Sequence, residues 1–310
     1  MNILVTGGAG FIGSHLCDAL LARGDRVTAL DDLSTGRREH LAGEVELVEA
    51  DVADTDAVTR TFARGSFDAV LHVAGQASIA NSYANPKRDL RTNVSGTLTV
   101  LDAAIVSGVP QFVFASSMTA YGEPRTVPTP ESEPCIPVSY YGVTKYAAER
   151  YVHVAGARND VELSVRSLRM FNVYGERQSL TNPYQGVLAI FIGNVLRGEP
   201  ITIHSDGKQT RDFVYVGDVV DAWLRVLDEP ATRNGVYNVG SGRATTIEEL
   251  AHAVVRAFGH DHWQIERAPQ QRGDLRRSCA DVHALETAVG WRAAMPLEEG
   301  MRRTIASANA

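Results

Sequence analysis

The first 170 residues alternate short apolar runs, rich in β-branched residues, with longer stretches in which apolar residues recur every three or four positions. The short runs predict strands, and the longer stretches predict amphipathic helices. Such an alternation is typical of a parallel sheet joined by crossover helices. The predicted strands cover residues 3–6, 26–30, 45–50, 69–73, 111–115 and 163–168, and the predicted helices cover 11–22, 56–63, 86–107 and 141–157.

Some predicted strands, such as 69–73, are apolar throughout, which suits a sheet covered by helices on both faces. The predicted fold class is therefore α/β, with a doubly wound parallel sheet of the Rossmann type. After Gly175 the alternation becomes irregular, with a helix, short strands and a mostly helical end. We predict a first domain over residues 1–174 and about 211–240, and a smaller, discontinuous α/β lobe over 175–210 and 241–310.

The composition is that of a globular protein, with 44% hydrophobic and 22% charged residues among 310. The net charge of −7 disfavours nucleic acid as a partner, because phosphate binding needs a basic face. No apolar run approaches the roughly 18 residues of a membrane span, and no secretory leader is recognisable, so we expect a cytoplasmic protein without membrane contact. Cys17, Cys135 and Cys279 are widely spaced, which predicts neither a disulfide framework nor a metal site.

A glycine-rich turn follows the first predicted strand and opens the first predicted helix. Gly7, Gly10 and Gly13 would permit a tight turn, a close approach of the backbone to a pyrophosphate, and packing of the helix on the strand. The start of the helix offers free N–H groups and the positive end of its dipole. Asp31 ends the second predicted strand, 18 residues after Gly13, where a carboxylate accepts hydrogen bonds from an adenosine ribose. The sequence thus predicts a dinucleotide site.

The carboxylate of Asp31 favours NAD over NADP, because it would repel a 2′-phosphate. The alternative for Asp31 and Asp32 is a solvated loop after a strand. Asp51 follows the third predicted strand, where it could reach the adenine amino group, and residues 73–75 follow the fourth strand at the same edge of the sheet. His72 lies inside an apolar strand and is interpreted as a core residue.

Three residues form a candidate catalytic set. Ser117 follows the fifth predicted strand, and Tyr141 and Lys145, 24 and 28 residues later, share one face of a predicted helix. The lysine would lower the pKa of the tyrosine from its usual value of about 10 and could hold a nicotinamide ribose. A tyrosine of lowered pKa serves as a general acid and base. By itself, such a pair could also be an amphipathic surface pair.

The motifs quoted so far belong to a larger set that covers nearly the whole chain and is specific in combination. Through them the chain resembles the extended short-chain dehydrogenase/reductase family, and within it the NAD-dependent UDP-sugar 4-epimerases. The motifs occupy residues 7–13, 31–36, 51–52, 72–75, 93–97, 116–117, 141–145, 169–175 and 210–216.

The resemblance implies reversible oxidation of one sugar carbon. Tyr141, as phenolate, would take the proton of the 4-hydroxyl while hydride moves from C4 to a tightly held NAD, and Ser117 would steady the oxygen. The 4-keto sugar would then turn about its link to the diphosphate, and hydride would return to the opposite face. Net oxidation is zero. The nucleotide must therefore be gripped while the sugar ring stays free to turn.

The resemblance also implies ligand contacts. Cofactor contacts would come from Gly7, Gly10, Phe11, Ile12, Gly13, Asp31, Asp32, Ser34, Thr35, Gly36, Asp51, Val52, Val73, Ala74, Gly75, Asn93, Tyr141, Lys145 and Phe171. Substrate contacts would come from Gln76, Ser116, Ser117, Thr119, Tyr141, Asn172, Val187, Leu188, Thr202, Ile203, His204, Arg211, Arg272 and Asp274.

Several of these substrate contacts have a specific role or an alternative. Arg211 would bind phosphate, and Asp274 would receive the uridine ribose or brace the arginine. Residues 201–204 would present backbone to the uracil. Relatives carry an arginine where this chain has Gln271, so Arg211 or Arg272 would supply that charge. The alternative for Arg211 is a solvated loop residue.

The residue after Ser117 separates branches of the family. Members that dehydrate or decarboxylate their sugar carry an acidic residue there, whereas this chain has Met118, which favours epimerisation. The sugar remains open among glucose, glucuronate and an N-acetylated hexosamine. Candidate sugar contacts also include Ser78, Arg177, Gln178 and Ser179.

Two other functions remain open: a different NAD-dependent nucleotide-sugar dehydrogenase or reductase, and a non-catalytic NAD-binding regulator. Relatives commonly form homodimers through a four-helix contact, which here would use residues 86–107 and 141–157.

Overall fold

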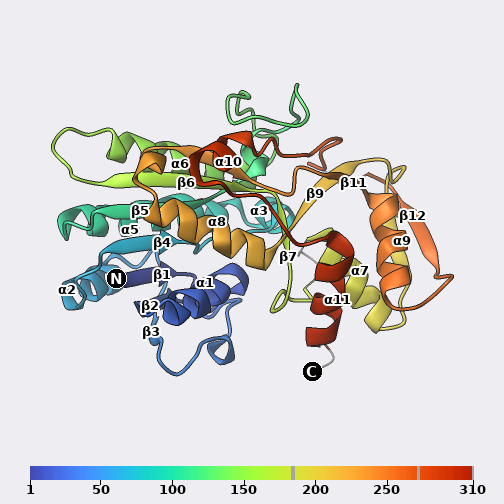
Figure 1. The fold of residues 1–310 in the computed structure, drawn as a ribbon, viewed down its shortest axis with the longest axis horizontal. Coiled ribbons are helices and arrows are strands. Elements are labelled where there is room, and N and C mark those ends of the chain that lie inside the picture. Colours follow the sequence, from blue (N-terminus) through green and yellow to red (C-terminus); the bar gives the residue numbers. More distant parts are fainter. Residues whose placement is uncertain (183–185, 271–272, 309–310) are drawn as a thin grey trace.

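The computed structural model describes residues 1–182, 186–270 and 273–308, and its main element is a seven-stranded parallel sheet (Figure 1). The strands are β1 (Asn2–Thr6), β2 (Arg26–Asp31), β3 (Glu46–Glu49), β4 (Ala69–His72), β5 (Gln111–Ser117), β6 (Ser164–Met170) and β10 (Val236–Val239). Their spatial order is β10-β6-β5-β4-β1-β2-β3, and every neighbouring pair is parallel. The predicted doubly wound α/β fold is confirmed.

Helices cover both faces of this sheet. They are α1 (Phe11–Ala22), α2 (Thr55–Arg64), α5 (Gly96–Val106), α6 (Tyr140–Gly156), α8 (Val216–Asp228) and α10 (His283–Val289). Successive residues of a strand point to opposite faces. Ile3 and Val5 therefore belong to the core under α1 and α8, with Trp223, whereas Leu4 belongs to the core under α2, α5 and α6, with Phe62.

The smaller lobe contains a three-stranded sheet, β11-β9-β7, and a two-stranded sheet, β12-β8, packed with three helices. Its elements are β7 (Asn172–Tyr174), β8 (Ile201–His204), β9 (Thr210–Tyr215), β11 (Ala244–Thr246), β12 (Ile265–Ala268), α7 (Val187–Leu196), α9 (Ile247–Ala257) and α11 (Leu297–Ala308). Figure 1 shows this lobe beside the large sheet. The chain leaves the lobe to place β10 at the edge of the large sheet. The domain boundaries given above stay a prediction.

The structure differs from the predicted elements in two ways. The predicted helix 86–107 is divided into α4 (Pro86–Leu90), a π-helical turn (Arg91–Ser95) and α5. Helix α3 (Ile79–Ala84) and strands β7, β11 and β12 were not predicted, since elements of three to six residues are too short to show a period. Short 3₁₀ turns cover Arg38–His40, Met118–Ala120 and Pro230–Thr232. In the described parts of the chain, no helix is both long and apolar enough to cross a membrane.

The strand order determines where a ligand binds. β1 lies between β4 and β2, so the crossover connections diverge to the two sides of β1. In open α/β sheets, ligands bind at the carboxyl ends of the strands at such a point. The glycine-rich turn, which follows β1, lies there.

Candidate active site

The glycine-rich turn is a close-packed cradle at the start of α1. Gly7 has a φ of +67°, and a Cβ at Gly13 would lie 2.0 Å from the carbonyl oxygen of Gly7. No side chain caps the first N–H groups of α1, whose N-cap is Gly10. Free N–H groups at the start of a helix can donate hydrogen bonds to the pyrophosphate of a dinucleotide. The glycines leave the neighbouring backbone uncovered, so the pyrophosphate can approach it closely.

Asp31 joins this turn to the loop after β2. Its Oδ2 accepts the N–H of Ala9 at 3.0 Å, and its Oδ1 accepts the N–H of Leu33 at 2.9 Å. Burial raises the pKa of this carboxyl group, which is 7% exposed. The solvated-loop alternative is therefore wrong for Asp31, whereas Asp32 is exposed and accepts hydrogen bonds from Ser34. Thr35 and Gly36 continue this loop, and a Cβ at Gly36 would lie 2.8 Å from Asp31 Oδ1.

Other predicted cofactor contacts lie farther along the sheet edge. Asp51 forms an ion pair with Arg91 at 2.6 Å, and Val52 packs under α5. Ala74 lies against the glycine turn, where a Cβ at Gly7 would be 2.8 Å from its nitrogen. The adenine contacts of Asp51 and Val52 stay predictions.

Asn93 was expected to contact the cofactor, but its side chain is occupied by the protein. Its Oδ1 accepts the N–H of Gln76 at 2.8 Å, and its Nδ2 lies 3.1 Å from both Asp89 Oδ1 and Thr144 Oγ1. The residue is 1% exposed. The Asn93 side chain therefore links Gln76 to Thr144 of α6, and its predicted contact with the cofactor stays a prediction.

One cavity of about 770 Å³ brings most of the remaining predicted residues together. It extends from the carboxyl ends of the large sheet to the small lobe. Predicted residues in its wall are Phe11, Ile12, Val73, Gly75, Gln76, Ser78, Ser116, Ser117, Thr119, Tyr141, Lys145, Phe171, Asn172, Gln178, Val187, Leu188, Arg211 and Asp274. Among the described residues of the wall, Asp274 is the only one with a carboxylate.

The catalytic set has the predicted arrangement. Ser117 ends β5, and Ser139 caps α6 by accepting the N–H of Gly142 at 3.1 Å. One helical turn then separates Tyr141 from Lys145, and both side chains line the cavity with Ser117. Thr119 Oγ1 donates to Ser117 Oγ at 2.9 Å, which leaves the Ser117 hydroxyl proton free to point toward the phenol.

The expected electrostatic effect of Lys145 on Tyr141 is wrong for the folded chain by itself. Burial raises the pKa of Tyr141 to about 12, and only the hydrogen bond from Ser117 opposes this rise. Burial likewise lowers the pKa of Lys145 to about 8, while Asp89 and Glu149 raise it. Desolvation is the largest cause of both pKa shifts, because neither side chain is exposed enough for water to stabilise its charge.

A buried ion pair joins α6, the helix that carries Tyr141 and Lys145, to strand β6. Glu149, two turns after Tyr141, lies 2.5 Å from Arg169 Nη2 of β6. Ser116 Oγ donates to the same carboxylate at 2.6 Å, and the guanidinium lies 4.7 Å from the centre of the Tyr121 ring. Ser116 is thus tied to α6, and its predicted substrate contact stays a prediction.

In the small lobe, Arg211 and Asp274 form a braced pair. Arg211 Nη2 donates to Asp274 Oδ1, and Nη1 donates to the carbonyl of Leu275 at 2.8 Å. Arg211 is 8% exposed, so the solvated-loop alternative is wrong. Asn172 Nδ2 donates to the carbonyl of Asp212 at 3.2 Å, which fixes it at the cavity wall. The bracing role of Asp274, one of two left open, is observed.

Some predicted substrate residues lie elsewhere. Thr202, Ile203 and His204 belong to β8 and are absent from the described cavity wall, and the carbonyl of His204 accepts a hydrogen bond from Gln209. Their contact with uracil stays a prediction. Gln271 and Arg272 lie outside the described residues. That Arg211 or Arg272 replaces the arginine that relatives carry at position 271 therefore stays a prediction.

Two further residues, Arg177 and Ser179, were placed near the sugar. Arg177 pairs with Asp18 at 2.7 Å, and neither Arg177 nor Ser179 belongs to the described wall of the cavity.

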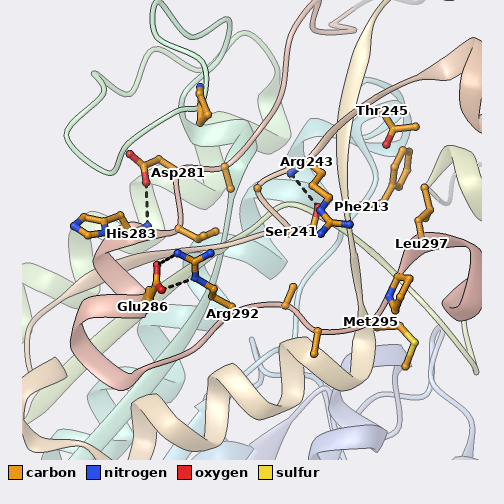
Figure 2. A pocket seen from close by; sticks show the side chains of 17 residues that line it. Phe213, Ser241, Arg243, Thr245, Asp281, His283, Glu286, Arg292, Met295 and Leu297 are labelled. Atoms are coloured by element: carbon orange, nitrogen blue, oxygen red, sulfur yellow. Dashed lines mark hydrogen bonds and ion pairs between the residues drawn. The ribbon is translucent and has the colours of Figure 1, made fainter.

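A second cavity is lined by residues of α10, the start of α11 and Phe213 of β9 (Figure 2). Figure 2 shows the ion pair between Glu286 and Arg292 and the side chain of Phe213, which lines both cavities. None of the predicted site residues lines this second cavity. The candidate chemistry therefore belongs to the first cavity.

The sequence interpretation missed several residues at the site. Ile79 and Tyr83 of the unpredicted helix α3 line the cavity. Asp89 and Glu149 lie near Lys145, and their negative charges raise its pKa. Glu149 follows Tyr141 and Lys145 at the same four-residue spacing, so its helical position was available as a signal. For Asp89 the local pattern contains no comparable signal.

Comparisons with known proteins agree with this geometry. A model of the NAD dependent epimerase/dehydratase family matches residues 3–240. The chain is 40% identical over 311 residues to the UDP-glucose 4-epimerase of Mycolicibacterium smegmatis, covering 98% of this chain and 97% of the relative.

Two solved structures are also similar, each 40% identical and aligned over 100% of this chain and 99% of the other. The Thermotoga maritima UDP-glucose 4-epimerase with UDP-glucose has a TM-score of 0.95, and the Thermus thermophilus UDP-glucose 4-epimerase in complex with NAD has one of 0.93. On its motifs, its fold and these matches, the chain belongs to the NAD-dependent epimerase/dehydratase family.

Proposed function

We propose that this protein is an NAD-dependent 4-epimerase of a UDP-hexose. The observation that carries the proposal is one cavity, whose wall contains Ser117, Tyr141 and Lys145 of the large domain together with the braced Arg211 of β9 in the small lobe. Phe11 and Ile12, at the start of α1, connect this wall to the glycine turn. NAD, when bound, supplies a reversible hydride acceptor.

In this reaction, each polar side chain of the cavity wall has its own role. Tyr141 exchanges a proton with the 4-hydroxyl, and Ser117 donates a hydrogen bond to the same oxygen. Lys145 holds a positive charge beside them and contacts the nicotinamide ribose. Arg211 binds the diphosphate through a rigid fork that Asp274 and the Leu275 carbonyl hold in place. The sugar is then the part of the substrate that is free to turn.

Two observations favour epimerisation over elimination. Met118 follows Ser117 at the cavity wall, and a thioether does not exchange protons. In the described wall, the single carboxylate, that of Asp274, is occupied by Arg211. Loss of water or carbon dioxide with the help of an acidic residue at this position is therefore disfavoured.

The test is product analysis without added cofactor. Purified protein is incubated separately with UDP-glucose, UDP-glucuronate and UDP-N-acetylglucosamine, and the products are identified by chromatography and NMR. The expected result is the C4 epimer of at least one substrate without net oxidation. Turnover that consumes NAD or NADPH in proportion to product would instead identify a dehydrogenase or reductase, and no turnover with any sugar would favour an NAD-binding regulator.

We also propose that the protein is a homodimer formed by α5 and α6. Apolar side chains on the outer face of α6 are exposed: Val143 by 48%, Tyr151 by 50% and Val154 by 58%. Leu90, the last residue of α4, and Val106, the last residue of α5, are exposed by 52% and 86%. An apolar face of this extent on two neighbouring helices fits a helix-to-helix contact with a second copy.

A charge on this face is expected to separate the dimer. Val154→Glu would bury an unpaired carboxylate in the contact, so sedimentation velocity should show a monomer where the unmodified protein is a dimer. Leu196→Glu, at the exposed end of α7, is the matched control and should leave the dimer intact. A monomeric unmodified protein would refute the proposal. The cytoplasmic location stays a prediction.

A further inference from the structure

Lys145 lies in a buried environment that needs a compensating negative charge. Its side chain is 5% exposed, and its Nζ lies 4.4 Å from the centre of the Phe114 ring. An ammonium group that loses water and gains no counter-charge tends to give up its proton. Since Lys145 is proposed to act as a cation, the source of the compensating charge matters for the chemistry.

The titratable groups around Lys145 come from four elements: His72 of β4, Asp89 of α4, Tyr141 and Glu149 of α6, and Arg169 of β6. His72 is neutral, because burial lowers its pKa to about 3, and it is hydrogen-bonded to the hydroxyls of Thr6 and Thr97. Tyr141 is a neutral phenol. The remaining charged groups are therefore Asp89, Glu149 and Arg169.

Glu149 and Arg169 compensate each other. Their side chains form two hydrogen bonds, Arg169 Nε to Glu149 Oε2 at 2.9 Å and Nη2 to Oε1 at 2.5 Å. The charge of Glu149 is therefore largely matched before it reaches Lys145. Among these described groups, Asp89 is left as the buried anion that forms no ion pair with an arginine.

Asp89 is fully buried, and its hydrogen bonds come from neutral side chains. Thr144 Oγ1 donates to its Oδ2 at 2.7 Å, and Gln76 Nε2 and Asn93 Nδ2 lie 2.7 Å and 3.1 Å from its Oδ1. These hydrogen bonds stabilise the ionised form without cancelling its charge. Thr144 directly precedes Lys145, and Gln76 is part of the cavity wall.

We propose that Asp89 is a positioning residue that provides the counter-charge of Lys145 and, through Thr144 and Gln76, fixes the cavity wall beside it. The proposal rests on the function proposed for Lys145. The direction of the electrostatic effects agrees: Asp89 is the largest influence that raises the pKa of Lys145, and it also raises that of Tyr141.

The decisive variant is Asp89→Asn, which removes the charge and keeps the shape. Its oxygen can accept from Gln76 and Asn93, and its amide can donate to Thr144 Oγ1, whose proton then goes to the carbonyl of Tyr141, 3.0 Å away. Without the negative charge, both Lys145 and Tyr141 should titrate at lower pH. We expect both limbs of the pH profile of kcat to move down by about 1 pH unit.

Asp56→Asn is the control, because it removes an exposed carboxylate from α2, away from the cavity and from the proposed dimer contact, and should leave the profile unchanged. If Asp89→Asn lowers kcat equally at all pH values, Asp89 has a purely structural role and the proposal is overturned.

A double-mutant cycle tests the pairing without any assay of activity. In the Lys145→Met background, Asp89 has no cation to compensate, so Asp89→Asn should raise Tm or leave it unchanged, whereas in the unmodified protein it should lower Tm. The same loss of Tm in both backgrounds would refute the pairing. The Asp89→Asn single variant could fail to fold. In that case, a folded Asp89→Asn/Lys145→Met double variant supports the pairing of Asp89 with Lys145, and a double variant that also fails to fold contradicts the pairing. A result in favour of the pairing stands even if the protein proves not to be an epimerase.

Discussion

Replacing Tyr141 with phenylalanine is expected to reduce the rate of epimerisation by about 10²- to 10⁴-fold, the usual contribution of a positioned general acid or base. The phenol is buried at the cavity wall next to Ser117, and its burial raises its pKa to about 12. Removing the hydroxyl removes the proton acceptor and leaves the shape of the wall. NAD content, measured by absorbance after denaturation of the purified protein, should be unchanged.

Tyr140→Phe is the matched control for this result. Tyr140 is the preceding residue of α6 and is 50% exposed, and its ring centre lies 5.2 Å from that of Tyr83, with the two rings tilted at 57°. Its loss of a hydroxyl should leave the rate within a factor of about two. Full activity of the Tyr141→Phe variant would show that another group exchanges the proton.

Replacing Gly13 with alanine is expected to abolish retention of NAD and to destabilise the fold by about 3 kcal/mol, the upper end of typical overpacking costs. The added Cβ would lie 2.0 Å from the carbonyl oxygen of Gly7 and 2.8 Å from the carbonyl carbon of the same residue. Both atoms are backbone, so α1 must move away from the turn. Denaturant unfolding and the NAD content of the purified protein measure the two effects.

Gly43→Ala is the matched control, because it replaces a glycine by alanine without creating the close contact that a Cβ at Gly13 makes with Gly7. Gly43 is exposed, and a Cβ there would meet nothing within 4 Å. Its replacement should change neither stability nor NAD content. If Gly13→Ala retained NAD and full stability, the close-packed turn would not be the cofactor cradle.

The parts of the site that the sequence predicted correctly are local. The glycine turn, the strand ends and the spacing of Tyr141 and Lys145 depend on residues within one strand, turn or helix, whose geometry repeats along the chain. The same holds for the core role of His72, which follows from the apolar strand around it and is confirmed by its burial.

Contacts between distant segments were not predictable in this way. Arg211 and Asp274 are 63 residues apart, and Asp89 and Thr144 are 55 apart. The sequence left open whether Asp274 braces the arginine, and it contained no sign that Asp89 faces the catalytic helix. Both facts depend on which elements pack together.

By itself, then, the sequence determined the doubly wound fold, the glycine turn after β1 and the placement of Tyr141 and Lys145 on one helical face, because short-range spacing and hydrophobic period fix them. Only the tertiary structure decided the electrostatics of the site. Burial reversed the expected shift of the Tyr141 pKa, and packing placed the anion of Asp89, rather than an exposed one, near Lys145. The cause is physical: desolvation and long-range pairing arise from the surroundings of a side chain, which a linear pattern does not contain.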